Sequence, residues 1–212
     1  MPFDLAPSSA TSQCFDNGTR IYRVGSRGST VLRPVGTVRR NGYINPGGAG
    51  AGNNEDAAAI LLDNPNFLSG RMFVGNPDVL YPLNGPQPAP KGTTVCSSGV
   101  EGGVNCGPVR RVYWAINRGP EGDPKNYAHR IVEVAAGNVT GDSGGPVWNP
   151  KTGAAVGLMS THSGLPNRPC HKVESGQTFC PRQSFTPLVP YKNQVAPLGA
   201  LPALGVSMFW NR

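Results

Sequence analysis

Glycine and proline interrupt this sequence so often that long helices cannot form in it. The 212 residues include 29 glycines and 22 prolines, together about a quarter of the chain. Both residues are costly inside helices but common in the turns between short strands, which favours an all-β protein with long loops. Such a content also borders on that of disordered chains. Because apolar runs recur along most of the chain, we expect a folded protein with some disordered segments.

Short β-prone runs recur along the chain and predict an antiparallel barrel. Residues 20–25 alternate polar and apolar side chains, as in a half-buried strand, and residues 30–38 form a second such run. The apolar stretch at 56–62 is compatible with a strand or a helical turn. Further short runs occur at 94–96, 109–116, 128–135, 145–148 and 154–160. Turn residues separate them, which is more typical of a barrel than of crossover helices.

A proline-rich segment divides the chain into two lobes. Residues 82–91 read Pro-Leu-Asn-Gly-Pro-Gln-Pro-Ala-Pro-Lys, the composition of a stiff linker. We therefore predict an N-terminal lobe at 1–81, a linker at 82–91 and a C-terminal lobe at 92–212.

Charge and hydropathy point away from two classes of partner. The net charge is +7, but Arg39-Arg40 and Arg110-Arg111 are the only adjacent basic pairs. No zinc-finger spacing or aromatic RNA-binding signature accompanies them, so we expect no nucleic-acid partner. No run of 18 apolar residues occurs, so we also expect no membrane partner, and we expect a monomer.

Four of the five cysteines form two pairs with the same spacing. Cys96 and Cys106 are ten residues apart, and so are Cys170 and Cys180. Close pairs in loop-like surroundings predict local disulfides, which imply an oxidising compartment. Zinc binding is the alternative, because His171 adjoins Cys170, but no Cys-x-x-Cys pair supports it.

The segment Gly-Asp-Ser-Gly-Gly-Pro at 141–146 is the sharpest chemical feature. Hydrolysis of a peptide bond by a serine needs an accessible hydroxyl and two main-chain N–H groups directed at the oxyanion. Flanking glycines let the main chain bend so that the amides of Gly141 and Ser143 converge. An ordinary glycine-rich turn is the alternative. Six consecutive residues of this composition favour Ser143 as a nucleophile.

This segment, with Val147, resembles the nucleophile motif of the chymotrypsin/trypsin-like serine proteases. The run Ala-Val-Gly-Leu-Met-Ser at 155–160 is similar to the strand that lines the specificity pocket in that family. The pattern Val-Cys-Ser-Ser-Gly at 95–99, followed by Cys-Gly at 106–107, resembles the bacterial streptogrisin-type branch, where it opens the second barrel with a disulfide. The likeness covers about residues 92–165.

The resemblance implies two antiparallel β-barrels with the active site between them, the first barrel being incomplete here. Ser143 would be the nucleophile, and the Gly141 and Ser143 amides would form the oxyanion hole. Ser160, Thr161 and His162 would bind the main chain of a polypeptide substrate. No metal or organic cofactor is implied. Since no aspartate occurs at 136–140, where the pocket floor would fall, a small or apolar substrate side chain is expected rather than Arg or Lys.

The first lobe matches the family more faintly. Asp56-Ala57-Ala58-Ala59-Ile60 is similar to the strand whose carboxylate orients the catalytic histidine, with Glu55 and Asp63 as alternatives. The family's Thr-Ala-x-His-Cys turn has its nearest match at 10–14, where Gln13 stands at the histidine position. No histidine precedes His129. A neutral amide has no useful basicity near pH 7. We therefore expect an impaired endopeptidase, with a pseudoprotease that binds peptide or protein in the cleft as the alternative.

Two further expectations follow from the resemblance. The partner of Cys14 would lie about sixteen residues earlier, before Met1, and no export signal is recognisable at the start. Truncation or decay of a secreted protease would explain both. Asp142 should be buried and should need a cationic partner, for which Arg110 and Arg111 are the candidates.

Overall fold

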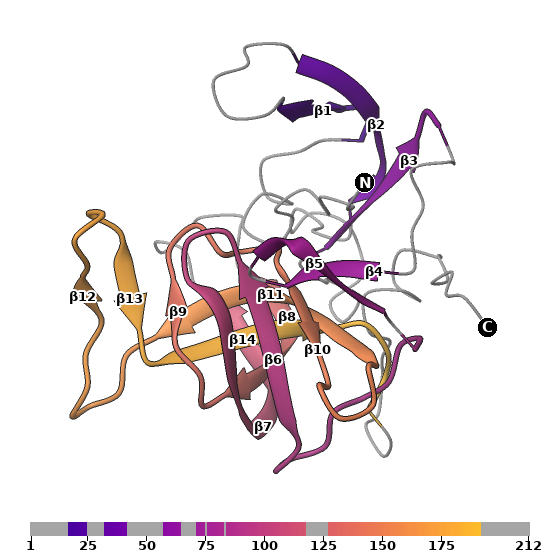
Figure 1. The fold of residues 1–212 in the computed structure, drawn as a ribbon. Helices are drawn as coiled ribbons and strands as arrows, with labels where there is room; N and C mark the ends of the chain where they lie inside the picture. The colour runs from indigo at the N-terminus through magenta and orange to yellow at the C-terminus, as the bar shows by residue number, and fades with distance from the viewer. Residues whose placement is uncertain are drawn as a thin grey trace.

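The computed structural model describes residues 17–24, 32–41, 57–64, 71–74, 76–82, 84–117 and 127–191. All regular elements of these segments are strands (Figure 1), which confirms the all-β prediction. No helix in this part of the chain is long and apolar enough to cross a membrane. Gln13, Cys14 and Asp56 lie outside the described residues.

The described N-terminal strands form two small antiparallel sheets. Strands β1 (Arg20–Val24), β2 (Leu32–Asn41) and β3 (Ala58–Leu62) pair in that order, while β4 (Arg71–Val74) pairs with β5 (Asn76–Pro82). The runs predicted at 20–25 and 30–38 are strands, and the ambiguous stretch at 56–62 resolves as a strand at β3. Pro34 lies in β2 opposite Tyr22 of β1, next to a register shift in the pairing of the two strands between Ile21 and Tyr22. Such irregularities are where a strand can contain proline.

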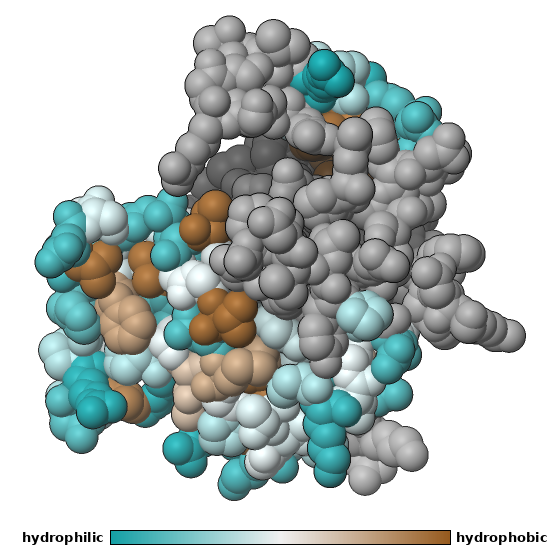
Figure 2. Space-filling view, in the orientation of Figure 1, coloured by the Kyte–Doolittle hydropathy of each residue, from teal (hydrophilic) through white to brown (hydrophobic). Residues whose placement is uncertain are grey.

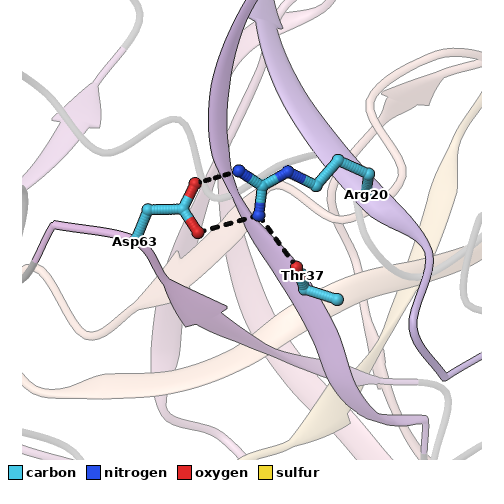
Figure 3. Close-up of polar contacts among 3 residues, drawn as sticks. All are labelled: Arg20, Thr37 and Asp63. Carbon is cyan, nitrogen blue, oxygen red and sulfur yellow. Dashed lines mark hydrogen bonds and ion pairs between the residues drawn. The ribbon is translucent and has the colours of Figure 1, made fainter.

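An ion pair connects the edge strand β1 to Asp63, the residue that follows β3. Arg20 lies opposite Thr37 in the register of β1 and β2 and donates to its Oγ1 at 3.0 Å. The same guanidinium contacts both carboxylate oxygens of Asp63, with Arg20 Nη1 to Oδ1 at 2.8 Å (Figure 3). This side-chain hydrogen bond raises the pKa of Arg20. Asp63 is therefore committed to a structural contact at the end of β3.

Six later strands close into a barrel in the order β10-β11-β14-β8-β7-β6. They are β6 (Thr94–Gly99), β7 (Gly103–Asn117), β8 (Tyr127–Val134), β10 (Pro146–Trp148), β11 (Ala155–Ser163) and β14 (Arg182–Pro187). The five runs predicted between 94 and 160 all lie in or overlap these strands. Closure pairs the strand edges with one another, so the barrel does not expose them.

Side chains that point inward from these strands fill the barrel. The largest is Phe185, which is fully buried and packs with Met159 and a shell of β-branched residues. Branched side chains suit this role because they pack well on a pleated surface. The valines of this cluster are Val95, Val109, Val132, Val134, Val147 and Val156. In the view of Figure 2, hydrophilic residues border the described part of the barrel lobe and some hydrophobic residues lie towards its middle.

A third sheet carries a hairpin that projects from the barrel (Figure 1). It has the order β12-β13-β9, with β9 at Asn138–Val139, β12 at His171–Lys172 and β13 at Thr178–Cys180. Strand β9 leads directly into the segment 141–146. Because β13 pairs with β9, the hairpin is connected to the residues that precede the predicted nucleophile turn.

The described part of the proline-rich segment runs along the barrel. The amide of Gln87 donates to Ala155 O at 3.0 Å, and Ala155 N donates to Gly85 O at 2.9 Å. The hydroxyl of Tyr191 accepts from Ala89 N at 3.1 Å and donates to Ala89 O at 2.9 Å. Residues 84–91 therefore pack against the C-terminal lobe rather than forming a free spacer.

The N-terminal sheet contacts the barrel through a small apolar cluster. Ala57, immediately before β3, is fully buried in a cluster with Ala155 and Leu188, which are also buried. Ala59 and Leu158 pack against the same cluster. Consequently the end of β3 that follows Asp56 is fixed against the barrel strand that bears the predicted substrate-binding residues.

Candidate active site

Glycines shape the turn around Ser143. Gly141 has φ of 108° and Gly144 has φ of 87°, both in the left-handed region that disfavours residues with a β-carbon. Gly145 is close-packed as well, since a Cβ there would lie 2.2 Å from Ser98 O. Ser143 is partly exposed, whereas Asp142 beside it is buried. The turn thus leaves Ser143 partly accessible to solvent and buries Asp142.

The amide groups of this turn alternate between engaged and free. Two of them, the N–H groups of Gly141 and Ser143, have no acceptor among the described residues. The amides around them donate to main-chain carbonyls at 2.8 to 3.1 Å, and these are the amides of Thr140, Asp142, Gly144 and Gly145. These two N–H groups, on either side of a buried aspartate, are the ones that the sequence predicts for an oxyanion hole, and that role stays a prediction.

Strand β11 is tied directly to the nucleophile turn. Gly144 N donates to Met159 O at 2.8 Å, and Met159 N donates to Gly145 O at 2.9 Å. The register with β14 shifts between Met159 and Thr161, so the irregularity falls at Ser160. Such a bulge redirects side chains near it. The structure therefore brings the predicted substrate-binding strand beside Ser143.

The three predicted substrate-binding residues differ in exposure. Ser160 is buried, Thr161 is exposed and His162 is half-buried. His162 lies opposite Gln183 of β14. The other histidines belong elsewhere: His129 lies opposite Ala115 in the barrel, and exposed His171 lies in the projecting hairpin.

Asp142 is buried as expected, but its partners among the described residues are main-chain amides and not Arg110, Arg111 or another cation. Its Oδ1 accepts from the amides of Glu101 and Gly102, both at 2.9 Å, and its Oδ2 accepts from Val139 N at 3.2 Å. Arg111 instead contacts Glu133 Oε2 at 3.1 Å. Main-chain N–H groups that converge on an anion can satisfy it without a formal positive charge. The Glu101 and Gly102 amides could not be predicted from the sequence, because main-chain donors have no signature in residue type.

Both predicted disulfides are present. Cys96 is bonded to Cys106 across the β6–β7 hairpin, and Cys170 to Cys180 at the base of the projecting hairpin. The zinc alternative fails because a cysteine in a disulfide has no thiolate to offer a metal. His171 instead stacks near Phe179, with ring centroids 5.3 Å apart.

Comparison with known proteins places this fold among bacterial proteases. No family model matches the sequence, and no curated protein matches it. Among solved structures, Thermobifida fusca protease A is 21% identical with a TM-score of 0.53, over 83% of this chain and 74% of that one. Cellulomonas bogoriensis chymotrypsin is 19% identical with a TM-score of 0.57, over 94% and 84%. Nocardiopsis protease is 20% identical with a TM-score of 0.53, over 82% and 74%.

These likenesses define the architecture. The chain has the fold of the bacterial chymotrypsin-like serine proteases, as the residues around Ser143 predict. The C-terminal lobe supplies the closed barrel of that fold, and the strands described before it form open sheets.

Proposed function

We propose that this chain is a serine-type endopeptidase scaffold in which Ser143 attacks the carbonyl carbon of a peptide bond. The supporting observation is that the amides of Gly141 and Ser143 have no acceptor in the described part of the chain, whereas those of Thr140, Asp142, Gly144 and Gly145 each have one. As Ser143 Oγ adds to the carbonyl, negative charge moves to the carbonyl oxygen. Two fixed N–H donors stabilise that charge more in the transition state than in the substrate.

The orienting carboxylate of this scaffold is proposed to be Asp56. Its neighbour Ala57 is buried against Ala155 and Leu188, which favours a position for residue 56 near the junction of sheet and barrel. The rival Asp63 is engaged with Arg20 at the opposite end of β3. That contact makes Asp63 a poor candidate.

The proton from Ser143 needs an acceptor, and Gln13 cannot serve. Loss of the base of a serine triad lowers turnover on the order of a millionfold, while the oxyanion hole and binding retain about a thousandfold over water. The activity of this chain is therefore proposed to be strongly impaired. The second candidate, a pseudoprotease that binds peptide or protein in the cleft between the lobes, is favoured by the same residue.

A fluorophosphonate probe distinguishes the two functions. Stoichiometric modification at Ser143, found by peptide mass mapping and abolished in Ser143→Ala, is the result expected of an endopeptidase. Labelling of wild type without hydrolysis of a peptide library would indicate a reactive serine that lacks turnover. A folded protein with neither labelling nor hydrolysis would refute the enzyme proposal and support the pseudoprotease.

The remaining properties follow from this proposal. The ligand would be a polypeptide, and the preferred side chain small or apolar. Two disulfides support an extracellular location. The division into lobes at 1–81 and 92–212, with a linker at 82–91, is retained as part of the proposal, as is a monomeric state.

A further inference from the structure

We propose that the turn joining β6 to β7 is a positioning element for the oxyanion site, acting through Asp142. This inference rests on the proposed function of Ser143. The turn comprises residues 99–103, and two of its amides bind the Asp142 carboxylate. Asp142 lies between the two residues whose amides are uncommitted. The turn therefore determines where the aspartate is held, and the aspartate determines how the two amides are presented.

The turn is shaped to receive this carboxylate. A Cβ on Gly99 would lie 2.1 Å from Asp142 Cγ, and a Cβ on Gly102 would lie 2.3 Å from Asp142 Oδ2. Real Cβ atoms do not approach other atoms so closely, so any side chain at either position would displace the aspartate. Neither glycine is required by a left-handed φ. Their shared feature is the space that they leave for Asp142.

The aspartate is also fixed through its own main chain. Asp142 N donates to Val139 O at 3.1 Å, and Asp142 O accepts from Gly145 N at 3.0 Å. The N–H of Ser143 belongs to the peptide plane that begins with this carbonyl. Displacement of the carboxylate would rotate that plane and redirect the Ser143 donor.

The hairpin that carries the turn is itself well supported. Strands β6 and β7 pair without interruption from Thr94↔Pro108 to Gly99↔Gly103, and the Cys96–Cys106 disulfide joins them within this ladder. Asn105 Nδ2, in β7, donates to Gly102 O at 2.9 Å and so connects the turn to this strand. A rigid support is what a positioning role requires.

The test compares two neighbouring alanine substitutions in the full chain. Gly102→Ala adds a methyl group against Asp142 without left-handed strain. Gly103→Ala adds strain, because its φ is 65°, but its Cβ would contact no atom within 4 Å. Amide hydrogen exchange of the 138–146 peptide should accelerate at least tenfold in Gly102→Ala and less than threefold in Gly103→Ala. Fluorophosphonate labelling of Ser143 should slow with the same ranking, with little change in probe binding.

The two readouts separate failure of the inference from failure of the proposed function. If wild-type Ser143 is never labelled, the enzyme proposal fails, while exchange of the 138–146 peptide still decides whether the turn orders that segment. Equal exchange in the two variants, or none above wild type, would overturn the positioning role. If Gly102→Ala does not fold, Asp142→Asn and Asp142→Ala replace it. Asparagine can still accept from the Glu101 and Gly102 amides, so it should accelerate exchange less than alanine does, and equal acceleration would contradict the inference.

Discussion

At the scale of single residues, the shape of the turn at 141–146 depends on positions where a β-carbon is not tolerated. Gly141 combines a left-handed φ of 108° with a place beside Glu101, whose Cγ would lie 3.0 Å from an added Cβ. A residue other than glycine held in such a conformation costs about 1–3 kcal/mol. The turn would relax to relieve that strain, and its amide would turn away from the oxyanion position.

We therefore expect Gly141→Ala to abolish any fluorophosphonate labelling that Ser143 shows in the wild type, and to lower the free energy of unfolding by about 1–3 kcal/mol. Gly92→Ala is the matched control, because φ there is 88° and no atom lies within 4 Å of the added Cβ. It should lose stability in urea titrations through the same backbone strain but retain labelling in full. Loss of labelling in both variants would show that global destabilisation is responsible.

The turn at 141–146 and its glycines were predictable from the sequence because the motif is local, but the partners of the side chains in it were not. The contacts of Asp142 were not, since the Glu101 and Gly102 amides are 41 and 40 residues away along the chain. The charge of Asp142 suggested Arg110 or Arg111 as its partner, whereas in the structure main-chain amides donate to its carboxylate.

At the scale of elements, the apolar runs between 94 and 160 were predicted as strands, whereas β4, β5 and the polar strand β14 were not. Its sequence, Arg-Gln-Ser-Phe-Thr-Pro, has no apolar alternation, yet it lies between β11 and β8 in the barrel. Ser97 Oγ donates to the buried Gln183 Oε1 at 2.9 Å, whereas Gln183 Nε2 is buried with no partner among the described residues. That contact spans 86 residues, so a local window of sequence cannot reveal it.

Glu133 provides an element-scale prediction, since it is buried between two arginines on neighbouring strands. Arg111 Nη2 and Arg182 Nη1 approach its Oε2 at 3.1 and 3.3 Å, and both cations are more exposed than the carboxylate. Removing both arginines would leave a buried charge without a cation, which costs about 3 kcal/mol. Glu133→Gln removes the buried charge itself and leaves an amide oxygen that can still accept a hydrogen bond from an arginine, so it should cost about 1 kcal/mol. Urea unfolding of Arg111→Ala/Arg182→Ala against Glu133→Gln measures the difference, and the reverse order would contradict this account.

At the scale of the whole molecule, catalysis would require the first lobe to bring a base to the barrel. The barrel bears the turn at 141–146, and the N-terminal sheet meets it at Ala57, Ala155 and Leu188. An orienting carboxylate has no effect on rate when no imidazole lies between it and the serine. We therefore expect the identity of residue 13 to decide whether the first lobe supplies a base to Ser143.

Replacing Gln13 with histidine tests whether the first lobe can supply that base. If residue 13 occupies the histidine position, Gln13→His should increase peptide hydrolysis at least a hundredfold over wild type, with activity rising as the new imidazole loses its proton near its usual pKa of about 6.5. The double variant Gln13→His/Asp56→Asn should lose most of this gain, because the imidazole is then no longer oriented. Gln13→Asn is the matched control and should remain at the wild-type rate. A folded Gln13→His protein that stays inert, although Ser143 is labelled, would show that the first lobe does not deliver residue 13 to the serine.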